Sequence, residues 1–229
     1  MEFFILLLCV ILIIILKLAL DIKLKEIFEL KKRSNKTLEK MSARFEEDNK
    51  MCKEILNLVG NESVKIEEDP KSKNSLYIVL TNKIIIGKFK QNYMKVQTIA
   101  HECIHSTQNK ITLWFNFIFS NIFNIYFFII SILTLFNKLN NTLAQTAIIT
   151  FMVTIQYIIR ESLENEAIIK APTIAKEYIN SKNNFSKKEK DELNKEYKYV
   201  TELGSKTTNF ILISKNVLKI IIYQIIIII

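Results

Sequence analysis

His101 and His105 are the only two histidines in the chain, and they stand four residues apart in the motif His101-Glu102-Cys103-Ile104-His105. On a helix, residues at this spacing lie one turn apart on the same face. Two imidazoles placed in this way can bind one Zn²⁺ at about 2.0–2.1 Å. Glu102 would project roughly 100° around the helix, within reach of a water molecule beside the metal. Because a carboxylate can take a proton from that water, the motif predicts a hydrolytic zinc site with Glu102 as its general base.

A simpler interpretation is an amphipathic helix that carries two surface histidines and an ordinary glutamate. The flanking sequence favours a helix in either case, because no Gly or Pro occurs in residues 91–113 and the apolar positions recur at helical spacing. These positions are Tyr93, Val96, Ile99, Ala100, Cys103 and Ile104. Cys103 falls on another face than the histidines, so we expect it to be a small buried residue and not a ligand.

A catalytic zinc takes three protein ligands and keeps one position open. No further histidine is available, so the third ligand must be a carboxylate or a thiolate. Three glutamates occur together in residues 160–167, and the middle one, Glu164, follows His105 by 59 residues (164 − 105). Glu161 and Glu164 would share nearly one helical face, whereas Glu166 would not. Spacing alone does not decide between Glu161 and Glu164.

The elements that must position these residues include four apolar blocks, at residues 3–20, 113–136, 143–159 and 210–229. Each is about long enough to span a bilayer core. A cleaved signal peptide is the alternative for the first block, but the basic segment and cleavage site of such a peptide are missing, so we expect a retained anchor. The second and third blocks, joined by a short polar loop, predict a transmembrane hairpin. The fourth contains Lys215 and Lys219 and is either a fourth span or an interfacial helix.

The distribution of basic residues predicts the orientation of these spans. Lys and Arg directly follow the first block, at Lys23, Lys25, Lys31, Lys32 and Arg33, and none precedes it. By the positive-inside rule, the segment after the first span is cytoplasmic. The hairpin then brings residues 160–207 back to the same side, where the glutamates can meet the histidines. We therefore expect a multi-pass protein of the cell membrane whose site faces the cytoplasm.

Composition limits the partners. The net charge of +9 favours anionic lipid head groups. Lysines alternate with glutamates, and no basic patch with interleaved aromatic residues occurs, which argues against nucleic acid as a partner. The three cysteines form no C-x-x-C motif, as expected for a reducing compartment without a disulfide framework.

Local signals predict the remaining elements. We expect a charged helix near the membrane surface over residues 21–50, a short helix capped by Asp48 and ended by Gly60, and strands at residues 64–67, 76–81 and 84–86. An edge strand of that sheet would either bind an extended substrate or be purely structural. Pro172 should kink or restart the helix of the glutamates. Ser186 and Glu189 form a capping box that should start a charged helix ending near Gly204.

The order of these elements resembles that of the bacterial membrane-bound neutral zinc metallopeptidases (YugP-like). Their motif H-E-x-G-H-x-x-Q is matched by residues 101–108, with Ile104 in place of the glycine, and their motif E-F-N-A-S-x-x-A by residues 164–171, with differences at Asn165, Glu166 and Ile168. The family's Asp-His-Tyr-Asp-Pro segment before the sheet has no counterpart. The resemblance implies that Glu164 is the third zinc ligand and that the zinc-binding helix belongs to a gluzincin-like α+β core.

We therefore expect a mainly α integral membrane protein with about four transmembrane helices and a small β-sheet before the zinc-binding helix. Its predicted parts are an anchor (1–20), a cytoplasmic α/β part (21–112), a hairpin (113–159), a cytoplasmic helical part (160–207) and a membrane helix (208–229). One Zn²⁺ per chain, held by His101, His105 and Glu164, would serve hydrolysis of a peptide or membrane-protein substrate. The sequence does not assign the oligomeric state.

The sequence also offers other roles. The rival interpretation is a non-catalytic membrane scaffold, or a degenerate peptidase that binds protein partners. Tyr157 and Arg160 are the oxyanion-stabilising candidates nearest to Glu164 in sequence, although a membrane-boundary position explains both more simply. Gln108 and Asn109 are the candidates for orienting a histidine ligand.

Overall fold

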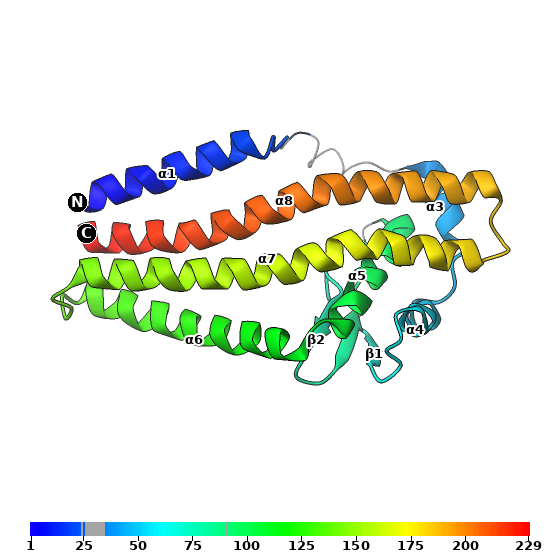
Figure 1. Ribbon diagram of the computed structural model, residues 1–229, viewed down its shortest axis with the longest axis horizontal. Helices are drawn as coiled ribbons and strands as arrows, with labels where there is room; N and C mark the ends of the chain where they lie inside the picture. The colour runs from blue at the N-terminus through cyan, green and yellow to red at the C-terminus, as the bar shows by residue number, and fades with distance from the viewer. Residues whose placement is uncertain (24, 26–34, 90) are drawn as a thin grey trace. The chain divides into compact units, whose positions relative to one another are not determined.

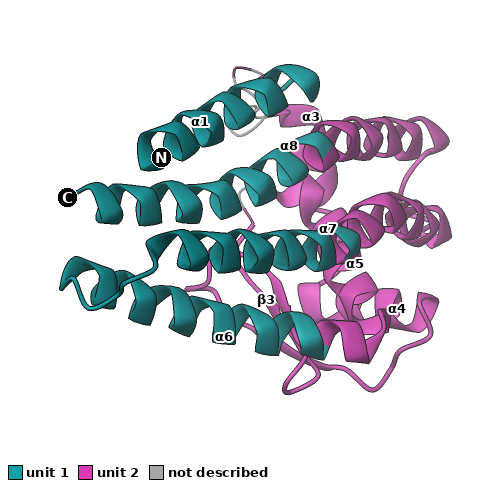
Figure 2. Ribbon diagram, turned by 60° about the vertical axis from the view of Figure 1, so that its left-hand side comes forward, with its two compact units in different colours: residues 1–22, 114–162, 206–229 teal, residues 23–113, 163–205 magenta. Residues whose placement is uncertain are grey.

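The computed structural model describes residues 1–229 except residues 24, 26–34 and 90 (Figure 1). The described residues are mainly helical and include one three-stranded sheet before the motif helix, which confirms the predicted mainly α class. They divide into two compact units (Figure 2). Unit 1 comprises residues 1–22, 114–162 and 206–229, and unit 2 comprises residues 23–113 and 163–205. The helix predicted over residues 21–50 lies partly outside the described residues. Within them it is not one helix, because α3 (Lys36–Ser42) ends there and residues 43–47 separate it from the next helix.

Unit 1 is built from α1 (Glu2–Ala19) and from parts of α6 (Lys110–Leu135), α7 (Thr142–Ser181) and α8 (Lys187–Ile228). Apolar side chains of all four helices form its core. The buried members are Cys9, Phe123, Ile130, Ile149, Val153, Val217, Ile220 and Tyr223. Polar contacts tie α8 to its neighbours: Gln224 donates to Thr146, at 2.8 Å, and Lys219 donates to Gln156, at 3.1 Å. Such hydrogen bonds between apolar helices are typical of membrane bundles.

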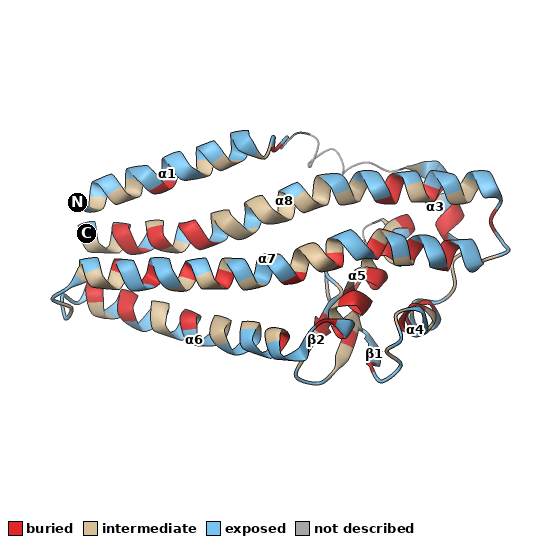
Figure 3. Ribbon diagram, in the orientation of Figure 1, coloured by how far each residue is buried: buried red, intermediate tan, exposed pale blue. Residues whose placement is uncertain are grey.

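Large apolar side chains also cover the outside of unit 1. Figure 3 shows α1 as mostly exposed, and its exposed residues include Phe3, Leu7 and Ile14. An exposed apolar surface of this extent marks a membrane or protein contact. The helices α1, α6, α7 and α8 are long and apolar enough to cross a membrane, which is compatible with a membrane location.

Unit 2 contains the sheet, in the order β1-β3-β2. β1 (Lys65–Glu68) runs parallel to β3 (Lys83–Ile86), and β2 (Leu76–Ile78) runs antiparallel to it, so β2 is an edge strand. The strands agree with the predicted positions, with β2 shorter than expected. Gly87 follows β3, where a Cβ atom would come within 2.5 Å of the Asn74 carbonyl oxygen, so only glycine fits.

The core of unit 2 lies where α4 (Asp48–Leu58) and α5 (Lys95–Thr107) pack together and α5 contacts β2 and β3. Figure 3 shows α5 as largely buried. The fully buried side chains include Met51, Ile55, Ile84, Val96 and Ile99. Cys103 is also fully buried, as predicted, and its sulfur lies 3.9 Å from that of Cys52. This packing fixes the helix that carries the histidines.

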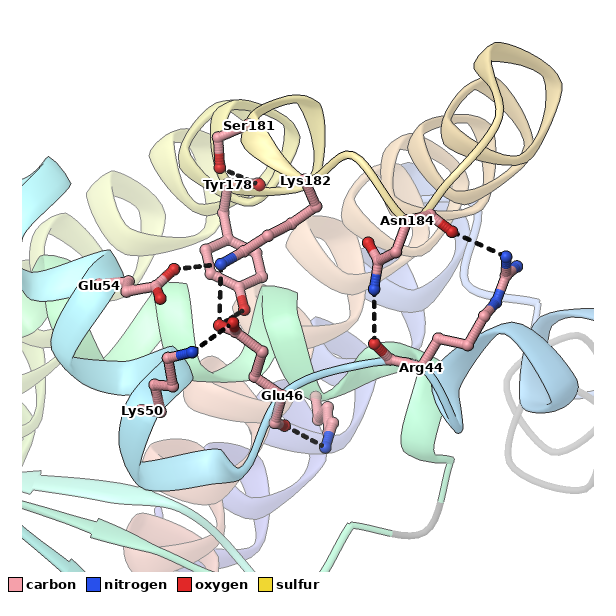
Figure 4. A network of polar contacts seen from close by, with 9 residues as sticks. Arg44, Glu46, Lys50, Glu54, Tyr178, Ser181, Lys182 and Asn184 are labelled. Atoms are coloured by element: carbon pink, nitrogen blue, oxygen red, sulfur yellow. Dashed lines mark hydrogen bonds and ion pairs between the residues drawn. The ribbon is translucent and has the colours of Figure 1, made fainter.

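A polar network holds the C-terminal part of α7 against α4 (Figure 4). Glu46 Oε2 accepts hydrogen bonds from Tyr178 Oη, at 3.1 Å, and from Lys182 Nζ, at 2.8 Å. Lys182 also pairs with Glu54, and Lys50 pairs with the other oxygen of Glu46. Tyr178 lies near the end of α7 and Lys182 directly follows that helix. This network therefore helps to position α7, which also contains Glu164.

The structure corrects one predicted helix cap. Asp48 is the first residue of α4 and not its N-cap, which is Glu47. The Asp48 carboxylate instead binds Lys95 Nζ, at 2.7 Å, so a long-range ion pair replaces the local cap. Gly60 does end the helix as predicted, with a positive φ of 73° that suits glycine.

One of the two alternatives for Pro172 is excluded, and one predicted helix end is wrong. α7 continues through Pro172 to Ser181, so it does not restart at the proline. The capping box of Ser186 and Glu189 forms as predicted, with Ser186 N donating to Glu189 Oε2 at 2.8 Å. The helix that it starts, α8, passes through Gly204 and ends at Ile228. A single glycine costs about 1 kcal/mol in a helix, which is too little to interrupt one this long.

Candidate metal centre

The two histidines of α5 face one another at one turn's separation. Their Nε2 atoms lie 3.1 Å apart, and the rings meet edge to face at an interplanar angle of 87°. Both side chains are partly exposed, at 23% for His101 and 14% for His105. One side of α5 is buried against α4 and the sheet. The two partly exposed histidines therefore lie on a different side of the helix.

α7 brings a carboxylate to the same point. Glu164 Oε2 lies 3.6 Å from His101 Nε2 and 3.9 Å from His105 Nε2. Among the described residues, the group that could hold a metal ion contains Glu164 and neither Glu161 nor Glu166. Its three residues come from segments that are far apart in the sequence but belong to the same compact unit.

The donor set fits a metal ion. Ligand atoms at 2.0–2.1 Å from a tetrahedral zinc are about 3.3–3.4 Å apart. The separations between His101 Nε2, His105 Nε2 and Glu164 Oε2 are 3.1, 3.6 and 3.9 Å and bracket that value. Each of the three residues offers one ligand atom that lies within 4.8 Å of the other two. Two imidazoles and one carboxylate leave one tetrahedral position open, as a catalytic zinc requires.

The same geometry affects protonation. Burial lowers the pKa of His101, and the neighbouring carboxylates of Glu164 and Glu102 raise it. Together the carboxylates outweigh burial, so the pKa of His101 is above its ordinary value. The raised pKa favours an imidazolium at His101 paired with Glu164. A metal would have to displace that proton in order to bind.

Glu102 lies beside the group and is only 7% exposed. Its Oε2 accepts a hydrogen bond from the backbone N–H of Tyr77 in β2, at 2.7 Å. Burial raises the pKa of Glu102 to about 7, although His101 and the Tyr77 N–H oppose the increase. One carboxylate oxygen is thus held by the edge strand, which leaves the other to accept a proton.

Gln108 connects the two segments that carry the group. It is 4% exposed, and its Oε1 lies 2.8 Å from His105 Nδ1. Its Nε2 donates to the Leu163 carbonyl oxygen, at 2.7 Å, and to Glu166 Oε2, at 3.1 Å. Of the two candidates for orienting a histidine, Gln108 contacts His105, whereas Asn109 caps α6 by accepting from Thr112 N.

The roles of Tyr77 and Glu166 were missed by sequence reasoning. Glu166 accepts from Lys170 on one oxygen and from Gln108 on the other. The i, i+4 spacing of Glu166 and Lys170 signalled their ion pair, but not the contact with Gln108. The Tyr77 contact is made by a backbone N–H, for which no side-chain type gives a signal.

The chain matches no protein-family model, and comparisons with curated proteins and with solved structures find no match.

Proposed function

We propose that the protein is an integral membrane zinc metallopeptidase. The observation that carries the proposal is the convergence of His101, His105 and Glu164, with Glu102 buried beside them. A surface pair of histidines on an amphipathic helix needs neither a carboxylate from a distant helix nor a buried glutamate as neighbour. Placing the chain in the neutral zinc metallopeptidase family rests on its sequence resemblance, and this pattern of residues supports it.

The residues have distinct roles in this proposal. His101, His105 and Glu164 would hold Zn²⁺, which when bound supplies a Lewis acid for a peptide carbonyl. Glu102 accepts a proton from the attacking water and passes it to the leaving amine. Its hydrogen bond from the Tyr77 N–H keeps the carboxylate oriented during both transfers.

The proposed substrate is a peptide or a membrane protein in extended conformation. β2 is an edge strand, so a substrate segment could add to the sheet there through backbone hydrogen bonds. The Tyr77 N–H already donates to Glu102, so such a segment would pair with other backbone groups at the edge of β2 and would lie alongside the proposed base. Successive side chains of such a segment would point to opposite faces of the sheet.

We further propose that α1, α6, α7 and α8 cross the cell membrane and that the site faces the cytoplasm. The supporting features are four helices of sufficient length and apolar character, and the Lys and Arg residues that directly follow residue 20. The positive-inside rule then assigns the side of the site.

Comparative proteomics of membrane fractions tests the function. Cells that make the wild-type protein should contain cleaved fragments that are missing in cells making Glu102→Gln, whereas the zinc content of the two purified proteins should be equal. Identical fragment patterns at equal expression would contradict peptidase activity and favour a scaffold. Glu67→Gln, an exposed acidic residue of β1, is the matched control and should leave the fragments unchanged.

A further inference from the structure

We propose that Gln108, itself held by Glu166, is the positioning residue that keeps His105 in the ring orientation and tautomer needed to bind metal through Nε2. The inference rests on the proposed metal centre. It assigns a role to a buried amide and to a carboxylate that takes no part in the metal-ligand group.

The contacts of Gln108 fix which way its amide points. The Leu163 carbonyl oxygen and the Glu166 carboxylate both accept hydrogen bonds, so the amide nitrogen must face them. The amide oxygen then faces His105 Nδ1, at 2.8 Å. An amide oxygen can only accept, so this network assigns the proton to Nδ1 and leaves the lone pair of Nε2 toward His101 and Glu164.

Glu166 places a carboxylate at the far end of the hydrogen bonds that lead to His105. One of its carboxylate oxygens pairs with Lys170 and the other accepts from Gln108. A continuous chain of hydrogen bonds thus runs from a carboxylate through an amide to the imidazole. The acceptor of a histidine ligand's second ring N–H fixes the ring orientation and raises its basicity as a metal ligand, and here that acceptor is the Gln108 amide polarised by Glu166.

Gln108 also fixes the distance between the ligand segments. It is the C-cap of α5, one residue beyond the helix that carries both histidines. Its bond to the Leu163 carbonyl oxygen holds the residue that directly precedes Glu164. One side chain therefore orients His105 and holds the backbone next to Glu164.

Gln108→Leu in the full-length protein is the direct test, and Gln97→Leu is its matched control. Gln97 is likewise a buried glutamine, within α5, and donates hydrogen bonds to another helix, at Tyr197 O and Thr201 Oγ1 of α8, and these hydrogen bonds do not involve the metal-ligand group. Zn²⁺ affinity is measured by competition with a chelator. We expect Gln108→Leu to lose about 10–100-fold in affinity, as is usual for such orienting groups. Gln97→Leu should stay near the wild-type value.

A spectroscopic readout separates orientation from general destabilisation. The chain has only two histidines, so the imidazole ¹⁵N spectrum of the metal-free protein at pH 9 contains the signals of only two rings. We expect His105 to carry its proton on Nδ1 in the wild type and in Gln97→Leu, and to lose this preference in Gln108→Leu. Glu166→Gln should keep the tautomer and show a smaller loss of affinity, because a neutral acceptor replaces a charged one.

The inference is overturned if Gln108→Leu binds Zn²⁺ as Gln97→Leu does, or if the His105 tautomer is the same with and without Gln108. Neither readout involves hydrolysis. A protein that binds zinc and shows these shifts but cleaves nothing would refute the peptidase proposal and support this one. A peptidase that is insensitive to Gln108→Leu would do the reverse.

Discussion

Glu161 and Glu164 stand three residues apart on α7, and helical spacing alone does not separate them. In the structure it is Glu164 that joins the two histidines in the possible metal site. The identity of this candidate ligand was thus implied by the resemblance and by no local rule. What the sequence could not indicate is the rotation of α7, which depends on packing along its whole length.

We predict that Glu164→Gln loses zinc affinity by more than the 10–100-fold expected for an orienting group, because it removes a ligand. Glu161→Gln should lose little. Equilibrium titration of both purified variants with Zn²⁺ and a competing chelator measures the difference. Loss of affinity on changing Glu161, with retention on changing Glu164, would mean that the ligand is Glu161 and that the resemblance misassigned it.

At the scale of elements, the sequence predicted the motif helix, the three strands and the capping box at Ser186, because each depends on neighbouring residues. It failed at Gly204 and Asp48. The course of α8 through Gly204 depends on packing with other helices, and the partner of Asp48 is Lys95, 47 residues away. The polar network at the end of α7 likewise joins residues more than 120 positions apart, such as Glu46 and Lys182.

That network predicts a pH dependence of stability. Hydrogen bonds from Lys182 and Lys50 lower the pKa of Glu46 from 4.5 to about 2. Because the pKa is lower in the folded state, the ionised carboxylate stabilises the fold above about pH 4.5, and this contribution is lost as the pH falls toward 2. Glu46→Gln should therefore lower the melting temperature at pH 7 and flatten its decrease on acidification.

Thermal unfolding in detergent, followed by circular dichroism between pH 7 and 3, measures this effect. Glu47→Gln removes an exposed neighbouring carboxylate and serves as the control. It should preserve the wild-type profile. If Glu46→Gln and Glu47→Gln gave the same profile, the network would contribute nothing measurable to the stability of unit 2.

At the scale of the whole molecule, the proposal requires that the chain cross the membrane and return before Glu164. We predict that Asn140→Cys, in the exposed α6–α7 loop, is labelled by an impermeant thiol reagent on intact cells. Asn180→Cys, exposed near the end of α7, should be labelled only after the membrane is opened. The background lacks Cys9, Cys52 and Cys103. The reverse labelling pattern would place the site outside the cell.

Metal content tests the central claim most directly. The full-length protein should be purified with about one zinc per chain, and Glu102→Gln should retain it, because Glu102 acts on water and is not a ligand. His101→Ala and His105→Ala should each abolish stoichiometric zinc, measured by elemental analysis against protein concentration. Zinc bound equally well by a variant that lacks both histidines would contradict the metal centre and the peptidase proposal that depends on it.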